Sequence, residues 1–426
     1  MRQSQRQGQT RDPSRRTMVE VPAGVDVDLP LPVALARACE VTPSLDQELV
    51  PLNEAHNRIL ARPLSSRVDD PPFDNSAMDG WALRYEDTND ASERTPTPLR
   101  IIGESRAAHE PNLPSVTPGT AVRIMTGAQV PPGADAILPI EHSRIEGDEV
   151  HVLAPGRPGF IRRRAENLAI GMIGLEQGAW LTPARVGLCA TMGHAEVPVL
   201  RRLRVTVLST GDELKPPGHD LLPGEIHESN SYGLVGLVRR MGHEAIVKDA
   251  VHDTAHALRT ALNEASADSD LILTSGGVSM GEYDLVRDLM FEHGSTRFWK
   301  ILLRPGGPPI FGTWNDVPLF GLPGNPVSSH VVFRVLVAPW MRSVTGADGP
   351  IEPMVRVRLV EAVKVAKNRL TLRRIQVEHT EEGLLAHAPT HQGSGNLNSL
   401  VLGDALTWIE PGTIADAGSW VDAILL

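Results

Sequence analysis

Three loops of this 426-residue chain combine glycine with hydroxyl and carboxyl side chains, a composition that suits a bound anion. They are Leu208–Leu214, Thr274–Asp284 and Gly321–Pro326, and each follows an apolar run that is typical of a β-strand. A turn at a strand end exposes backbone N–H groups, and a following helix adds the positive end of its dipole. An ordinary strand-to-helix turn is the alternative for each loop alone. Three such loops in one sheet favour ligand binding.

The second loop has the clearest phosphate-binding composition. Its candidate binding residues are Ser275, Gly276, Gly277 and Ser279, which precede a predicted helix. Glycine lets the backbone approach a ligand closely, and hydroxyl groups can donate hydrogen bonds to phosphate oxygens. The Gly-Lys-Ser/Thr ending of a nucleotide-binding P-loop is absent, so this loop is not a P-loop.

Two cations are expected on one face of a strand within Phe298–Gly306. Side chains alternate along a strand, so Lys300, Leu302 and Arg304 should point the same way. The arginine fork and the compact ammonium group both suit a phosphate-rich ligand. A solvated edge strand is the alternative interpretation.

Three carboxylates are expected at the same rim of the predicted sheet. Glu213 ends the first loop, and Asp253 and Asp284 lie at junctions between loops and helices. Carboxylate oxygens can hold Mg²⁺ jointly with a phosphate and water molecules. For Asp253, the alternative is a plain helix N-cap.

The elements that must position these residues form four zones. Residues 191–346 alternate strands and helices, which predicts a doubly wound α/β domain with a parallel sheet. Residues 63–155 are rich in Pro, Gly and Val and predict a β-rich insertion. This insertion interrupts a discontinuous helical linker domain made of residues 29–62 and 156–190. Residues 350–426 alternate short strands with turns and predict a small C-terminal β barrel.

Within these zones, individual helices can be predicted from their start and stop signals. A short helix is expected at Ala55–Leu60, and another begins at Pro183 after Thr182 as its N-cap. A long apolar helix is expected over Val327–Met341, after the Leu-Pro-Gly-Asn-Pro turn.

The composition excludes several classes of function. A formal net charge of -11 argues against bulk binding of nucleic acid or an anionic membrane. No apolar run reaches the roughly 18 residues that would span a bilayer. Cys39 and Cys189 form no metal or redox motif, which fits a reducing, cytoplasmic location. The arginine-rich residues 1–28 predict a disordered tail, with a transit peptide as the alternative.

Three further polar segments lie outside the α/β zone: Asp74–Gly80, Met125–Ala128 and the basic Arg162–Asn167. The first could be a buried turn and the third a solvated linker. The basic segment could instead contact an anionic ligand across a subunit boundary.

Taken together, these strings resemble the MoeA family of molybdopterin molybdenumtransferases, which includes the E domain of gephyrin. The resemblance covers about residues 30–426. The strings that carry it are Asn75–Gly80, Ile124–Ala128, Ser209–Leu214, Thr274–Gly281 and Leu322–Pro326, in the order of the family.

The resemblance implies a homodimer of four-domain subunits, with the active site between the α/β domain of one subunit and the β insertion of the other. It also implies roles for single residues. From the partner subunit, Asp79 and Thr126 would face the site, with Arg162 at its edge. Glu213, Asp253 and Asp284 would handle metal and molybdate, Lys300 and Arg304 would bind phosphate or oxyanion, Pro323 and Pro326 would shape the pocket wall, and Ser394 would come from the C-terminal domain.

The family reaction takes adenylylated molybdopterin and molybdate, with Mg²⁺, and releases AMP and the molybdenum cofactor. A molybdopterin adenylyltransferase would then be the substrate donor. Two alternatives remain open: a catalytically weakened paralogue or scaffold that binds molybdopterin, and the adenylyltransferase itself, which shares the α/β fold.

Two departures from the family pattern bear on these alternatives. Gly307 stands where the family often has lysine, and Arg164-Ala-Glu-Asn167 stands where it often has Arg-Gly-Glu-Asp. Because Asp79, Glu213, Asp253 and Asp284 are all present, we expect an active enzyme.

Overall fold

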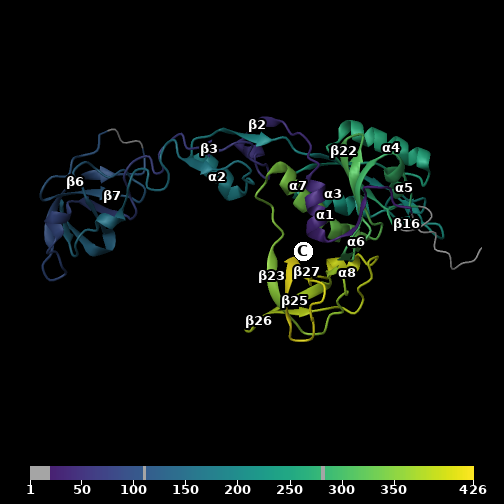
Figure 1. Cartoon of the computed structure of the whole chain (residues 1–426). Helices are drawn as coiled ribbons and strands as arrows, with labels where there is room; N and C mark the ends of the chain where they lie inside the picture. Colours follow the sequence, from purple (N-terminus) through teal and green to yellow (C-terminus); the bar gives the residue numbers. More distant parts are fainter. Residues whose placement is uncertain (1–19, 109–111, 280–283) are drawn as a thin grey trace, which may run out of the picture. The chain divides into compact units, whose positions relative to one another are not determined.

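The computed structural model describes residues 20–108, 112–279 and 284–426, and it divides the chain into two compact units (Figure 1). Unit 1 comprises the described residues up to Asp46 together with Leu200–Leu426, and unit 2 comprises Gln47–Val199. Most of the predicted tail, residues 1–19, lies outside the described residues. No helix among the described residues is long and apolar enough to cross a membrane.

Unit 1 is built on a seven-stranded sheet in the order β1-β19-β21-β22-β18-β14-β17. The strands are β1 (Asp26–Leu29), β14 (Arg204–Ser209), β17 (Glu244–Val247), β18 (Leu271–Ser275), β19 (Ser295–Ile301), β21 (Ile310–Trp314) and β22 (Val317–Leu322). Both faces of the sheet are covered. Leu271 and Leu273 of β18 belong to one apolar core and Ile272 to the other, as expected for a strand buried on both sides.

Helices pack on each face of this sheet. The first core includes residues of α1 (Leu31–Cys39), α3 (Asn230–Arg240), α6 (Pro326–Val332) and α7 (Ala338–Thr345). The second core includes residues of α4 (Ala255–Asp268) and α5 (Leu285–Glu292). The predicted fold class is confirmed: a doubly wound α/β domain accompanied by β-rich domains and a small barrel.

The sheet is mixed rather than wholly parallel. Strands β14, β17, β18 and β22 pair in parallel, whereas β21 runs antiparallel to both β19 and β22. Asn315 and Asp316 form the two-residue connection between β21 and β22, with φ angles of 48° and 65°. Two consecutive left-handed residues of this type favour a tight hairpin, which is why the direction reverses here.

The segment Asp26–Cys39 was predicted to belong partly to the tail and partly to the linker domain, but in the structure it packs within unit 1. Asp26–Leu29 forms β1 and pairs with β19, and Leu31, Ala34 and Ala38 of α1 join the first core of unit 1. The apolar stripe of α1 is therefore buried against the α/β unit.

Several predicted helix boundaries are corrected. Thr254, not Asp253, caps α4, because its Oγ1 accepts a hydrogen bond from Ala257 N at 3.2 Å. The predicted helix at Ala55–Leu60 is absent, and the only helical turn nearby is the 3₁₀ turn Leu52–Glu54. The long helix after Pro326 is interrupted by a π-helical turn, Phe333–Val337, between α6 and α7.

The C-terminal part of unit 1 is a closed barrel, as predicted. Its strands are β23 (Met354–Leu359), β26 (Gly383–His387), β25 (Arg374–Thr380), β27 (Ala405–Trp408) and β28 (Trp420–Leu425), in spatial order. The barrel also carries the short helix α8 (Asn398–Val401). It joins the α/β part through the parallel pair β20 (Leu303–Arg304) and β24 (Leu370–Thr371). A second small pair, β15 (Leu214–Lys215) with β16 (Ile226–His227), lies within the α/β part.

Unit 2 contains a six-stranded sheet in the order β8-β5-β7-β6-β10-β9. These strands are β5 (Gly80–Leu83), β6 (Thr97–Ser105), β7 (Thr120–Ile124), β8 (Ala136–Pro139), β9 (Ser143–Glu146) and β10 (Glu149–Val152). The other described strands of this unit form two-stranded pairs. They are β2 (Gln47–Pro51) with β13 (Glu196–Leu200), β3 (Leu64–Ser65) with β12 (Ile173–Leu175), and β4 (Asn75–Ser76) with β11 (Ile161–Arg162). The unit also contains the helix α2 (Pro183–Thr191). Thr182 caps α2 as predicted, accepting a hydrogen bond from Arg185 N.

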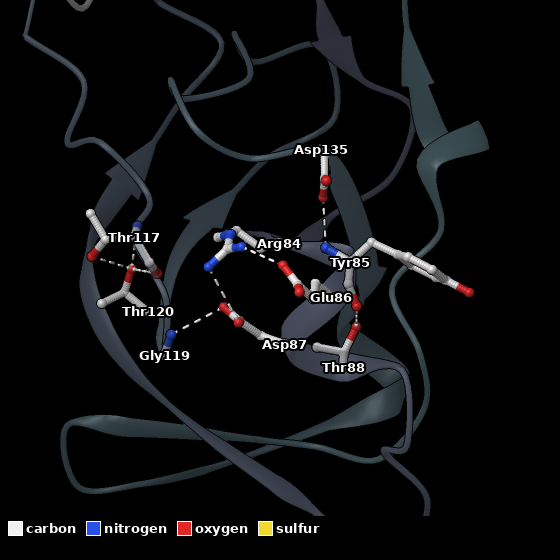
Figure 2. Close-up of polar contacts among 9 residues, drawn as sticks. All are labelled: Arg84, Tyr85, Glu86, Asp87, Thr88, Thr117, Gly119, Thr120 and Asp135. Carbon is white, nitrogen blue, oxygen red and sulfur yellow. Dashed lines mark hydrogen bonds and ion pairs between the residues drawn. The ribbon is translucent and has the colours of Figure 1, made fainter.

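Carboxylates hold the turn that follows β5 in this sheet, as Figure 2 shows. Asp135 Oδ1 accepts a hydrogen bond from Tyr85 N at 2.6 Å, and Asp87 Oδ2 accepts one from Gly119 N at 3.0 Å. These bonds satisfy backbone donors that the sheet leaves unpaired, so they tie the turn to two neighbouring loops.

Candidate functional site

A cavity of about 650 Å³ lies at the carboxyl ends of β14, β18 and β22 in unit 1. This is where an open α/β sheet binds its ligands. The three predicted loops meet there, and nine of the predicted site residues line it: Glu213, Asp253, Ser275, Gly276, Gly277, Ser279, Asp284, Pro323 and Pro326.

The glycine loop after β18 requires its glycines for both conformation and space. Gly276 and Gly277 have φ angles of 103° and 65°, in the region that favours glycine. A Cβ at Gly276 would lie 3.0 Å from the backbone oxygen of Thr210, and one at Gly277 would lie 3.2 Å from Val286 N. Larger residues here would strain the fold as well as the site, so these positions are poor probes of binding alone.

Asn230, which sequence reasoning missed, ties two of the three loops together. Its Nδ2 donates to Ser275 Oγ and to the backbone oxygen of Gly324, each at 2.7 Å. Its Oδ1 is buried and accepts no hydrogen bond from the residues that the structure describes. Asn230 also lines the cavity, so it fixes the distance between the glycine loop and the proline turn.

Glu228 is a second site residue that the sequence did not reveal. This buried carboxylate accepts hydrogen bonds from Ser209 Oγ at 2.9 Å and from Ser231 N at 2.8 Å. It therefore joins the end of β14 to the first turn of α3. A lone glutamate in a polar loop carries no spacing signal that would have identified it.

On the acidic side of the cavity, the carboxylates of Asp212 and Glu213 lie close enough to Asp253 to affect its ionisation. Burial raises the pKa of Asp253, and the nearby carboxylates of Asp212 and Glu213 raise it further. Asp212 Oδ1 forms a hydrogen bond with His252 Nδ1 at 3.0 Å and accepts one from Asp253 N at 3.2 Å. Asp284 faces Arg287, with 3.6 Å between Oδ2 and Nη1. Among the described residues, no three acidic, histidine or cysteine side chains converge closely enough to hold a metal ion.

The two predicted cations lie beside the cavity rather than in its lining. Lys300 Nζ lies 3.7 Å from the centre of the Trp299 ring, a cation–π contact, and Lys300 has a φ of 67°. That left-handed conformation marks a break in the regular strand before Arg304, which is exposed.

The predicted Ser394 belongs to a barrel loop that meets the cavity. Its backbone oxygen accepts a hydrogen bond from Val327 N at 3.1 Å, at the start of α6. Ser394 itself is not among the lining residues, but its neighbours Gly395 and Leu397 are. Arg374 holds the loop by donating to Gly393 O at 3.0 Å, and burial lowers the pKa of this guanidinium to about 10.

The remaining three predicted residues lie in unit 2. Asp79 Oδ1 accepts hydrogen bonds from Thr126 N at 2.7 Å and Thr126 Oγ1 at 2.9 Å, so the structure brings these two together. The hydrogen bonds from Thr126 hold the pKa of Asp79 below its ordinary value. Arg162, in β11, pairs with Asn75 of β4 and is exposed.

Both departures in the Arg164–Asn167 segment have structural consequences. Ala165 has a φ of 62°, where glycine would be unstrained and alanine is not. Asn167 Nδ2 donates to Asp70 Oδ2 at 3.1 Å, a bond that an aspartate at 167 would replace with a like-charge contact. Arg164 and Arg163 form ion pairs with Asp69 and Asp74.

Gly324 offers a cleaner probe of ligand binding than Gly276 or Gly277. It lines the cavity without a left-handed φ, and a Cβ there would lie 3.5 Å from Gly276 Cα, an ordinary contact. We expect Gly324→Val to fold normally but to weaken binding of the adenylylated molybdopterin that the family resemblance implies about tenfold, because the isopropyl group fills space between two loops. Titration calorimetry measures this, with Gly236→Val on the exposed side of α3 as the control. Equal affinities for both variants would contradict the placement.

Comparison with known proteins agrees with this arrangement. Three family models match the chain: "MoeA N-terminal region (domain I and II)" at residues 29–193, "Probable molybdopterin binding domain" at 206–343 and "MoeA C-terminal region (domain IV)" at 356–426. The cavity's three loops lie in the second match, and the barrel lies in the third.

Relatives of nearly full length extend the comparison. Molybdopterin molybdenumtransferase 2 of Mycobacterium tuberculosis is 38% identical over 348 residues, covering 80% of this chain and 85% of its own length. Molybdopterin molybdenumtransferase of Bacillus subtilis is 30% identical over 408 residues, covering 93% and 94%. The crystal structure of the molybdopterin biosynthesis moeA protein from Pyrococcus horikoshii matches with a TM-score of 0.80 at 30% identity, covering 94% of this chain and 100% of that one.

Proposed function

We propose that this chain, which belongs to the MoeA family, is a molybdopterin molybdenumtransferase that inserts molybdate into adenylylated molybdopterin and releases AMP and the molybdenum cofactor. The observation that carries the proposal is the cavity at the strand ends, where a glycine loop, a proline turn and an acidic rim meet. The glycine loop suits the phosphates of the substrate. No nucleophile of the enzyme is required, because the dithiolene sulfurs of molybdopterin form the bonds to molybdenum.

Within this site, we assign Mg²⁺ to Glu213 and Asp253 together with phosphate oxygens of the substrate. Burial raises the pKa of Asp253, the neighbouring carboxylates raise it further, and a bound cation would favour the charged form. Mg²⁺ commonly takes only one or two carboxylates and shares substrate phosphates, so a three-carboxylate cluster is not needed. When bound, it would polarise the phosphoanhydride bond that is cleaved. Asp284 already faces Arg287, and its part in metal binding stays a prediction.

The function is tested directly by turnover. Purified protein should release AMP from adenylylated molybdopterin only when molybdate is present, and the rate should depend on Mg²⁺. Protein that binds the substrate but releases no AMP under these conditions would instead be the weakened paralogue or scaffold. What favours an enzyme is that the relatives similar to this chain over most of its length are named molybdopterin molybdenumtransferases.

The adenylyltransferase alternative accounts for less of the chain. The activity would need only the α/β domain, whereas the family models for the N-terminal and C-terminal regions also match here. We propose that an adenylyltransferase acts as the substrate donor. We also propose a cytoplasmic location, consistent with the two unpaired cysteines, Cys39 and Cys189.

A homodimer with shared sites is the last part of the proposal. Asp79 and Thr126 lie together in unit 2, and the cavity belongs to unit 1, so in the proposed dimer each site combines unit 1 of one subunit with unit 2 of the other. Mixing Asp79→Ala subunits with Asp253→Asn subunits should then restore activity. Random reassociation would leave about a quarter of the sites intact, since half of the dimers are mixed and each holds one complete site.

The measurement is AMP release after the two inactive variants are dissociated together and allowed to reassociate. Each variant treated alone is the control. A mixture no more active than its components, with mixed dimers verified by differential tagging, would exclude a site shared between subunits.

A further inference from the structure

A second cavity, of about 180 Å³, lies within unit 1 where the α/β part meets the barrel, and we call it the joint pocket. Residues of α3, the π-helical turn, α7, the barrel strands β23, β27 and β28 and the linker Pro350–Glu352 line it. Asn230 at the start of α3 lines the cavity at the strand ends, whereas Arg240 at the end of α3 lines the joint pocket. A helix of 11 residues places its two ends about 15 Å apart, so the joint pocket is a separate site.

The body of the joint pocket is apolar. Met241, Val335, Ala338 and Ile424 are buried members of the first core that also line the pocket. Trp408 of β27 lines it as well, and aromatic rings pack favourably against an indole. An apolar cavity of about 150 Å³ can hold one benzene molecule. The joint pocket therefore has room for a single ring or a short aliphatic chain.

Three arginines line the same pocket: Arg240, Arg334 and Arg342. Glu352 is the one carboxylate among its described lining residues, and it pairs with Arg334 Nη1 at 2.6 Å and with Arg240 Nη2 at 3.4 Å. Arg342 Nη1 donates to the backbone oxygen of Pro350 at 3.5 Å. Cationic groups therefore outnumber anionic groups in the lining of an apolar space, which suits a ligand with an apolar body and an anionic end.

Arg334 has a hydrogen-bond donor that the protein leaves unused. The residue is only 7% exposed, and its Nε is buried and donates to no acceptor among the residues that the structure describes. A buried donor without an acceptor is unfavourable. Burial also lowers the pKa of this guanidinium, an effect that Glu352 offsets only in part and that Arg240 strengthens. A carboxylate bound in the joint pocket would supply the missing acceptor and favour the charged form.

We propose that the joint pocket is a second ligand site, which binds a small monocarboxylate whose apolar part is a single ring or a short chain. The carboxylate accepts a hydrogen bond from Arg334 Nε, and the apolar part packs among Met241, Ala338 and Ile424. The inference goes beyond the proposed function and does not depend on it, because it uses none of the residues that line the cavity at the strand ends.

The test compares phenylacetate with phenylacetamide, which has the same ring and a similar shape but no charge. The whole protein is isotopically labelled at its methionine methyl groups for nuclear magnetic resonance, because Met241 and Met354 both line the joint pocket. Their signals are assigned from Met241→Leu and Met354→Leu, two substitutions that nearly conserve volume. We expect phenylacetate to shift both signals with a Kd on the order of 0.1–1 mM, as suits so small a ligand, and phenylacetamide to bind about tenfold more weakly.

Two variants test the assignment from different directions. Arg334→Lys keeps a positive charge beside Glu352 but removes Nε, so it should weaken phenylacetate binding about tenfold. Ala338→Met fills the pocket and leaves the arginines in place, so it should abolish binding. The matched controls are Arg239→Lys on α3 and Ser343→Met on α7, two exposed residues outside the pocket lining, and both should bind phenylacetate like the parent protein.

Three results would overturn the inference: no shift of the Met241 and Met354 signals with phenylacetate, equal affinity for phenylacetamide, or parental affinity in Arg334→Lys or Ala338→Met. Equal affinity would mean an apolar pocket that does not recognise a carboxylate. Parental affinity in either variant would place the bound carboxylate elsewhere. If Arg334→Lys does not fold, Ala338→Met and its control still decide the location. AMP release takes no part in these measurements, so the proposed function can fail while the joint pocket stands, and the reverse.

Discussion

Replacing Asp253 with asparagine should lower the rate of AMP release about 100-fold, equivalent to about 2.7 kcal/mol of activation free energy. Asparagine keeps the shape of the side chain and removes the charge that we assign to Mg²⁺. The loss should appear mainly as a changed dependence on Mg²⁺ concentration. Binding of adenylylated molybdopterin should change far less, because we propose that its phosphates bind at the glycine loop instead.

The same substitution should leave the folded state at least as stable at neutral pH. Burial and the neighbouring carboxylates of Asp212 and Glu213 raise the pKa of Asp253 in the folded protein above its unfolded value. A raised carboxyl pKa contributes stability only at low pH, and this contribution is lost as the pH rises through the folded pKa. The Asp253→Asn variant has no such loss. Its free energy of unfolding, relative to that of the parent protein, should therefore increase from acidic to neutral pH.

Asp270 supplies a control of opposite sign. Burial alone would raise its pKa, but hydrogen bonds from Arg201 and Arg204 outweigh that effect and hold the pKa below its ordinary value. Its stabilisation is present at neutral pH and is lost as the pH falls through the folded pKa. Asp270→Asn should therefore lose stability and keep its turnover. An Asp253→Asn variant that behaved in this way would make Asp253 a structural residue.

What the sequence revealed about the site depended on local signals. Gly276 and Gly277 could be predicted because a strand, a glycine-rich loop and a helix follow one another within a short stretch. Glu228 and Asn230 could not, because their roles depend on partners at Ser209, Ser275 and Gly324 that only the folded sheet brings near. Single polar residues in a loop give no periodicity by which to recognise them.

The fold shows the same division between local and long-range signals. The barrel and the α/β alternation were predictable from strand and turn patterns. The antiparallel strand β21 was not recognised, although Asn315 and Asp316 are a usable hairpin signal. The sequence also did not reveal that α1 belongs to unit 1. Its apolar stripe shows that the helix is buried on one face but not which element covers that face. That question is decided by α7, about 300 residues away along the chain.

Trp340 of α7 is the residue that holds α1 in unit 1, and replacing it with alanine should cost about 3–5 kcal/mol of stability. Its side chain is fully buried, and its Nε1 donates to the backbone oxygens of Ala38 at 3.1 Å and Val41 at 3.3 Å. Its ring meets Phe320 edge-on with 5.5 Å between centroids, at the end of an aromatic row. Alanine would leave a cavity there and remove the donor that both carbonyls share.

Because proteins are stable by only about 5–15 kcal/mol, a loss of this size should lower the midpoint of urea unfolding of unit 1 markedly. It should also expose the segment before Asp46 to limited proteolysis, since α1 would lose its main anchor. Trp340→Phe keeps most of the ring and should cost much less. Trp420→Ala, which removes a half-exposed barrel tryptophan, should change the midpoint little. If Trp340→Ala unfolded at the midpoint of Trp420→Ala and resisted proteolysis equally, α1 would be held by the rest of the first core without Trp340.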